Sequence, residues 1–197
     1  MSYPILYAAY GANTNRAHMK NRCPLAKYVG NCTLHDHAMV FRGVADVVYR
    51  PGRETKCALW EIMPSDEQAL DRFEGYPFNY TKRFATIQYK GERRRVMFYI
   101  MTGTRADQYE PPQSYENTLR EGYKQCGGIP QKQITSAIDA AKRSTSRQKT
   151  YRGSWVQKDK AAASAQAPAA PMTQRIIDVL GADWFARNFD DSNLKDI

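Results

Sequence analysis

The chain has 197 residues, of which 42% are hydrophobic and 25% are charged, and its formal net charge is +9 at pH 7. A chain of this length and composition is typical of one globular domain with an appendage, because it can bury a substantial core. No apolar run approaches the roughly 20 residues of a membrane-spanning helix, and residues 4–10 lack the basic flank of an export signal. We therefore expect a cytoplasmic protein without a membrane anchor.

The positive charge is concentrated in residues 142–160, which contain seven Lys or Arg residues and one Asp. A basic cluster beside a linker is more often a solvated segment than a reader of nucleic acid, so we expect no nucleic-acid partner. The cysteines show no Cys-x-x-Cys spacing and are expected to be reduced thiols. His35 and His37 lie near Cys32 but lack a second ligand pair, which predicts no metal site.

Strands are expected first along the chain. Residues 5–10 form an apolar strand that ends at Gly11, and residues 13–22 suit a short helix closed by Pro24. A turn is expected at Pro51-Gly52. Further strand patterns cover residues 26–35, 38–41, 45–49 and 56–62.

A helix over residues 67–73 is predicted next, with Ser65 or Asp66 as its N-cap and Gly75 beyond its end. Two alternating strands, 83–89 and 94–100, then form a hairpin through Lys90-Gly91-Glu92.

The period changes to helical over residues 114–126, and Pro130 opens another helix that runs to about Ala141. Strands followed by helices predict an α+β domain, which we assign to residues 1–150. Residues 151–171 read as a basic, then Ala/Pro-rich, linker. Residues 172–197 regain a helical pattern and are a candidate for docking on the domain, on a second copy or on a protein partner.

Three motifs stand out by their order and spacing. The first is Tyr7-Ala8-Ala9-Tyr10-Gly11-Ala12-Asn13, followed by Met19 and Arg22-Cys23-Pro24. The second is Leu70-Asp71-Arg72-Phe73-Glu74-Gly75, with Tyr80 six residues after Glu74. The third is Pro112-Gln113-Ser114-Tyr115, followed by Gly122 and Gly127-Gly128-Ile129-Pro130. Together they resemble the γ-glutamyl cyclotransferase family over roughly residues 5–141. The resemblance implies a small mixed-strand β-barrel flanked by helices, with a substrate pocket at one end of the barrel.

The resemblance also implies a reaction, in which the α-amino group of a γ-glutamyl amide attacks its own γ-carbonyl and releases 5-oxoproline. An α-amino group has a pKa of about 8, so a proton must be removed before attack and returned to the leaving amine. Glu74 is the candidate general acid and base. Neither a cofactor nor a metal is implied, because only protons and an acyl group are transferred.

By position in the family, Tyr10, Gly11, Ala12 and Asn13 bind the γ-glutamyl group. Tyr80 and Tyr115 are further candidates for the pocket, although a tyrosine in such positions also packs well in a core. Asp71 lies one helical turn before Glu74 and is expected to pair with a base or to cap the helix locally.

The chain departs from the family pattern at Ala12, where serine is common, and at Thr14, where an apolar residue is common. Because of both departures, the family pattern does not determine which leaving group the substrate carries. A protein that binds γ-glutamyl compounds without converting them remains an alternative.

Overall fold

The centre of the fold is a five-stranded sheet with strand order β2-β3-β1-β5-β4, in which only the β1–β5 pair is parallel. The computed structural model describes residues 4–103 and 108–156, with side chains as far as residue 146. The strands are β1 (Ile5–Ala9), β2 (Lys27–Phe41), β3 (Ala45–Ile62), β4 (Tyr80–Tyr89) and β5 (Glu92–Met101). Helices cover this sheet, so the predicted α+β class is confirmed.

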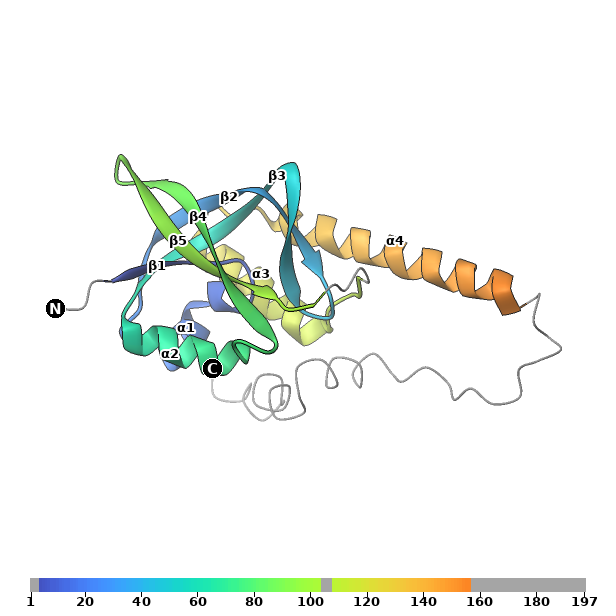
Figure 1. Ribbon diagram of the computed structural model, residues 1–197, viewed down its shortest axis with the longest axis horizontal. Helices are drawn as coiled ribbons and strands as arrows, with labels where there is room; N and C mark the ends of the chain where they lie inside the picture. Colours follow the sequence, from blue (N-terminus) through green and yellow to red (C-terminus); the bar gives the residue numbers. More distant parts are fainter. Residues whose placement is uncertain (1–3, 104–107, 157–197) are drawn as a thin grey trace.

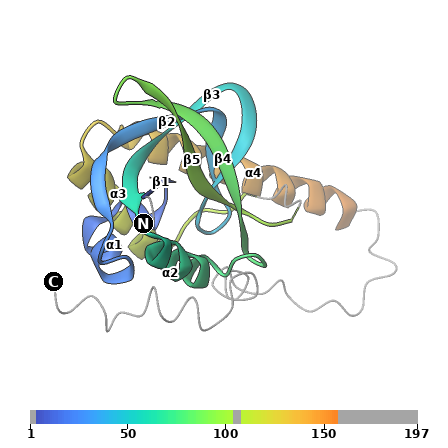
Figure 2. The ribbon, with the colours of Figure 1, turned by 60° about the vertical axis from the view of Figure 1, so that its left-hand side comes forward.

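The sheet is strongly curved and arches over α2 (Figure 2). Across the arch, the ring of His37 on β2 contacts the ring of Phe98 on β5 at 5.3 Å between centroids. Among the described strands, β2 and β4 remain the two edges and do not pair with each other. The expected barrel is therefore an open one, held across its gap by side chains.

The helices are α1 (Arg16–Arg22), α2 (Pro64–Glu74), α3 (Gln113–Cys126) and α4 (Gln131–Val156), with a 3-10 turn η1 (Ala12–Thr14) before α1. One apolar cluster joins the sheet to these helices. Its members with at most 1% exposure include Leu34, Leu59, Leu70, Met97, Leu119 and Ile134. Each such side chain contributes about 1.5–3 kcal/mol when it is fully buried.

The turn predicted at Pro51-Gly52 is wrong, because β3 continues through both residues. Instead the β2–β3 register shifts there: His37 faces Tyr49, while His35 faces Glu54. The extra residues of β3 bulge out, and the Gly52 amide donates to Asp36 Oδ1 at 2.8 Å. A proline has no amide hydrogen to pair, so it fits a bulge without interrupting the strand on either side.

The N-cap predicted for α2 is also wrong. Met63 is the N-cap and Pro64 occupies the first helical turn, where its missing N–H costs nothing. Asp66 reaches back, and its Oδ2 accepts from the Met63 amide at 3.0 Å. The predicted end of the helix is confirmed, because Gly75 takes the left-handed conformation with φ 64°.

The predicted strands 26–35 and 38–41 form one continuous strand, β2, and the predicted strands 45–49 and 56–62 both belong to β3, whereas the predicted hairpin is confirmed. Lys90 and Gly91 both have positive φ and form the tight β4–β5 turn. The short helix predicted over residues 13–22 divides into η1 and α1, with Asn15 as N-cap.

Helix α4 runs beyond the sheet as far as Val156 (Figure 1). The observed helix is therefore longer than the prediction, which ended it at about Ala141. It includes residues 151–156, the start of the predicted linker. The rest of the linker and the C-terminal tail lie outside the described residues. Within the part of the chain that the structure describes, no helix has the length and hydropathy needed to cross a membrane.

Candidate active site

The loop after β1 is held in place by short local contacts. The Gly11 carbonyl accepts from the Thr14 amide at 3.0 Å and from the Thr14 hydroxyl at 2.8 Å. Helix α3 packs closely against the loop at Gly122. A Cβ on residue 122 would lie 2.8 Å from the backbone carbon of Thr14, so only a glycine allows this approach. Thr14, which departs from the family pattern, therefore has a structural function in this loop.

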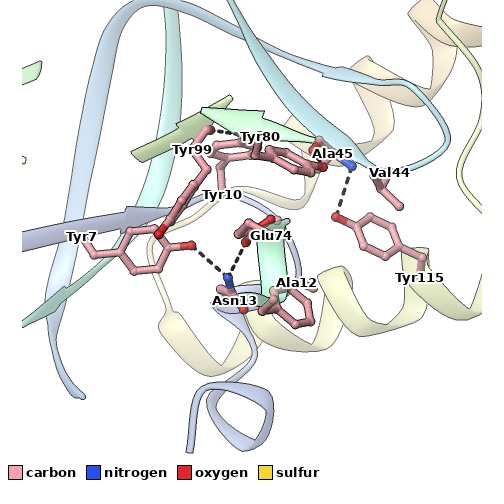
Figure 3. Close-up of a pocket in the computed structure, with 12 residues that line it drawn as sticks. Tyr7, Tyr10, Ala12, Asn13, Val44, Ala45, Glu74, Tyr80, Tyr99 and Tyr115 are labelled. Atoms are coloured by element: carbon pink, nitrogen blue, oxygen red, sulfur yellow. Dashed lines mark hydrogen bonds between the residues drawn. The ribbon is translucent and has the colours of Figure 1, made fainter. Parts of the chain in front are cut away.

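Glu74 is the last residue of α2 and turns its carboxylate toward this loop (Figure 3). The side chain is only 9% exposed. Its Oε1 accepts a hydrogen bond from Asn13 Nδ2 at 3.0 Å, and the same amide nitrogen donates to the Tyr7 hydroxyl at 2.9 Å. One amide group thus links the first strand, the loop and the end of α2.

Arg22 fixes the orientation of that amide from the other side. Its Nη1 donates to Asn13 Oδ1 at 2.6 Å, and its guanidinium lies 3.6 Å from the ring centroid of Phe73. Burial lowers the pKa of Arg22 to about 10, so the group keeps its charge at neutral pH. Because the guanidinium binds Oδ1, the NH₂ side of Asn13 faces Glu74 and Tyr7.

The pKa of Glu74 is raised to about 7. Burial is the main cause, because it penalises the charged carboxylate, while the Arg22 charge and the Asn13 hydrogen bond lower the pKa and partly oppose it. A carboxyl group with this pKa is present in both protonation states at neutral pH. It can therefore accept and return a proton in one reaction cycle.

Tyrosine rings form much of the remaining wall. The Tyr10 hydroxyl donates to the Tyr99 carbonyl at 2.7 Å, and the Tyr115 hydroxyl accepts from the Ala45 amide at 3.1 Å. Burial raises the pKa of Tyr10, Tyr80 and Tyr115, so these phenols stay neutral in the working range of Glu74.

The structure brings all the residues proposed from the sequence as catalytic or substrate-binding to this one pocket. They are Tyr10, Gly11, Ala12, Asn13, Glu74, Tyr80 and Tyr115. Sequence reasoning missed further lining residues, namely Tyr7, Val44, Ala45, Phe73 and Tyr99. Tyr7 and Phe73 stand inside two of the recognised motifs, which was a usable signal. No sequence signal pointed to Tyr99, because its position in the pocket depends on β5 pairing with β1.

Asp71 does not join Glu74. It accepts from Lys82 Nζ at 2.7 Å and from the Tyr99 hydroxyl at 2.6 Å, so the expected pairing with a base is confirmed. Among the described residues, no group of three or more His, Cys, Asp or Glu side chains is arranged to hold a metal ion.

Comparison with known proteins agrees with this fold. The model of a family described as gamma-glutamyl cyclotransferase, AIG2-like, matches residues 7–121. A solved structure named gamma-glutamyl cyclotransferase superposes with a TM-score of 0.60 at 18% identity, covering 89% of this chain and 98% of that one.

An uncharacterised protein from Homo sapiens gives a TM-score of 0.60 at 19% identity, covering 89% and 99% of the two chains. YkqA from Bacillus subtilis gives 0.58 at 21% identity, covering 69% of this chain and 54% of its own. At these identities the structures support the fold alone. A search of curated proteins finds no match.

Proposed function

Because the chain belongs to the γ-glutamyl cyclotransferase, AIG2-like family, we propose that it converts a γ-glutamyl amide into 5-oxoproline and a free amine, with Glu74 as the general base and acid. The observation that carries the proposal is the buried carboxylate of Glu74, with a pKa of about 7, facing the Gly11–Asn13 loop across one pocket. A solvated carboxylate would be too weak a base for this work.

In the proposed reaction the neutral α-amino nitrogen of the substrate attacks the γ-carbonyl carbon. A C–N bond forms as Glu74 takes a proton from the attacking nitrogen. The protonated Glu74 then donates that proton to the nitrogen of the leaving amine, the original amide C–N bond breaks, and the carbonyl of the new lactam re-forms. Holding the substrate in a folded shape supplies part of the rate, because intramolecular attack is favoured by geometry alone.

The roles proposed for the loop follow from its position in the family pattern. A Cβ on Gly11 would lie 3.1 Å from the Tyr115 hydroxyl, so the missing side chain lets that hydroxyl lie close to the loop backbone in the pocket. We assign Tyr10, Gly11, Ala12 and Asn13 to the γ-glutamyl group, and Tyr80 and Tyr115 to the pocket wall. Ala12 places a methyl group where the family pattern often has a serine hydroxyl.

The substitution Glu74→Gln tests the base directly. It preserves size and removes only the titrating group, so we expect a normally folded protein whose kcat falls by about 10²–10⁴-fold. The readout is 5-oxoproline release from a panel of γ-glutamyl dipeptides and γ-glutamyl amines. Glu67→Gln is the matched control, because Glu67 is on the same helix but pairs with Lys82 outside the pocket.

Each outcome of this experiment decides something different. Turnover in Glu74→Gln equal to that of the unmodified chain would overturn the assignment of the base. Saturable binding of γ-glutamyl compounds without any product, in the unmodified chain, would favour the alternative of a binding protein on this fold. The panel also identifies the leaving amine.

We also propose a cytoplasmic location. The four cysteines, Cys23, Cys32, Cys57 and Cys126, are free thiols. Cys32 and Cys57 face each other on neighbouring strands without a disulfide, which a reducing compartment maintains.

A further inference from the structure

A second hollow lies between α4 and the β2–β3 pair, away from the pocket of Glu74. Its volume is about 730 Å³, which is within the range of sites that hold several side chains. Apolar residues from both layers line it. They are Ala38, Met39, Val40, Ala137 and Ala140. We call this hollow the α4 groove.

Positive charge surrounds the α4 groove. Arg50, Arg53, Lys56 and Lys132 line it, against Glu54 as the one acid in the lining. Lys56 already pairs with Glu54 at 3.3 Å. Arg50, Arg53 and Lys132 make no ion pair with any residue that the structure describes. An occupant of the groove must therefore combine apolar surface with acidic groups.

The lining also lacks a hydrogen-bond donor at one point. Gln108 Oε1 is buried and accepts no hydrogen bond from the described residues. A buried amide oxygen without a hydrogen-bond donor is energetically unfavourable, because it has lost its water without gaining a partner. An occupant that brings an N–H group to this place would relieve that cost.

The chain itself contains a segment with these properties, outside the described residues. Residues 176–191 carry four Asp and one Arg, so the segment is acidic in a protein of net charge +9. Its apolar residues include Trp184, whose indole N–H is a donor, and Phe185. Acidic groups, aromatic surface and a donor are what the α4 groove lacks.

The length of the chain permits the segment to reach the groove. Ala140 lies 16 residues before Val156 on α4, which is about 24 Å along the helix. The 19 residues between Val156 and Ile176 are Ala- and Pro-rich and can span at most about 63 Å when extended, which exceeds this distance. The covalent connection also gives the segment a millimolar effective concentration at the groove.

We propose that the α4 groove is the docking site of the acidic, aromatic segment 176–191 of the same chain. The Asp carboxylates meet Arg50, Arg53 and Lys132, and the aromatic residues cover the apolar part of the lining. This docking is independent of the reaction proposed for Glu74, since none of the groove residues lines that pocket.

Carbodiimide cross-linking of the full chain tests the proposal, because it joins a lysine amine to a carboxylate only when the two are in contact. We expect an amide between Lys132 and an Asp of residues 183–191, identified by mass spectrometry of the monomer. The Lys82–Asp71 pair, at 2.7 Å, is the internal positive control. The Lys132 product should fall about fivefold or more in Arg50→Gln/Arg53→Gln, because surface ion pairs are individually weak but are lost together.

Arg93→Gln/Arg94→Gln removes the same charge from exposed positions on β5 and should leave the product unchanged. Mixing ¹⁴N and ¹⁵N chains distinguishes the alternatives, because docking within one chain gives no mixed products. Mixed products would assign the groove to a second copy and overturn the proposal. Formation of the Lys82–Asp71 product without any Lys132 product would also overturn it.

Discussion

At the scale of single residues, the site depends on how Asn13 is oriented. Its amide has one acceptor and one donor group, and Arg22 occupies the acceptor. Glu74 and Tyr7 are therefore left with the donor side. A reversed amide would present an oxygen to the Glu74 carboxylate and raise its pKa further. Arg22 thus acts through Asn13 as well as through its charge.

This arrangement makes Arg22 a positioning residue whose loss should appear in a pH profile. The Arg22 charge lowers the pKa of Glu74 against the effect of burial. In Arg22→Gln we expect the acidic limb of kcat/KM, near pH 7 in the unmodified protein, to move to higher pH, because the free carboxyl group then ionises less readily. Rates measured from pH 5 to 9 with a fixed γ-glutamyl substrate would show the shift.

Arg22→Lys is the matched variant, since it retains the charge but loses the planar guanidinium over Phe73. Its limb should remain close to that of the unmodified protein even if its rate falls. An equal loss of rate at every pH in both variants would mean that Arg22 is only structural.

The sequence allowed some of these residues to be predicted and not others. Glu74 and Asn13 stand in motifs with a fixed order along the chain, so both could be proposed without a structure. The link between Arg22 and Asn13 could not, because it depends on α1 folding back over η1, nine residues apart in the sequence.

At the scale of elements, the loop that faces Glu74 is positioned by α3. The contact is close because Gly122 has no side chain: a Cβ there would lie 2.7 Å from the Asn15 nitrogen and 2.8 Å from the backbone carbon of Thr14. Both are backbone atoms, so neither can move aside without moving η1. The helix and the loop are therefore coupled at one residue.

Gly122→Ala should for this reason destabilise the protein, although alanine normally stabilises a helix interior relative to glycine. We expect a loss of about 1–3 kcal/mol in the free energy of unfolding, typical of overpacking. A higher KM should accompany it, because the Gly11–Asn13 loop is displaced. Urea denaturation and steady-state kinetics measure the two effects.

Glu121→Ala is the control for Gly122→Ala, because it changes the adjacent, exposed residue of the same helix. It should alter stability by no more than about 0.5 kcal/mol. A Gly122→Ala protein as stable as this control would show that the loop and α3 are not coupled through this contact.

Elements with strong local signals were predictable, and those set by pairing were not. The β4–β5 turn was predictable because Lys90-Gly91-Glu92 separates two alternating strand patterns. In the structure Lys90 and Gly91 both have positive φ, as such a turn requires. Pro51-Gly52 has an equally strong turn signal, but pairing with β2 on both sides of the bulge keeps β3 continuous. The strand order, with β1 between β3 and β5, had no counterpart in the sequence pattern.

At the scale of the whole molecule, the buried Glu74 connects the site to global stability. Its pKa is about 7 in the folded protein and near 4.5 when solvated. Between these two values the folded state binds more protons than the unfolded state. The free energy of unfolding must therefore fall as the pH rises through this interval.

The size of this effect can be predicted. Below pH 4.5 the carboxyl group is protonated in both states and does not affect stability; above pH 7 the folded protein holds a buried carboxylate. A shift of this size corresponds to a loss of about 3 kcal/mol in the free energy of unfolding by pH 8.

Glu74→Gln cannot ionise, so its free energy of unfolding should exceed that of the unmodified protein by an amount that grows with pH, relative to their difference at pH 4.5. Urea denaturation of both proteins at pH 4.5 to 8 measures the difference and cancels the other titrating groups. A difference that stays constant across this range would mean that Glu74 has an ordinary pKa, and would remove the basis for its role as a base near neutral pH.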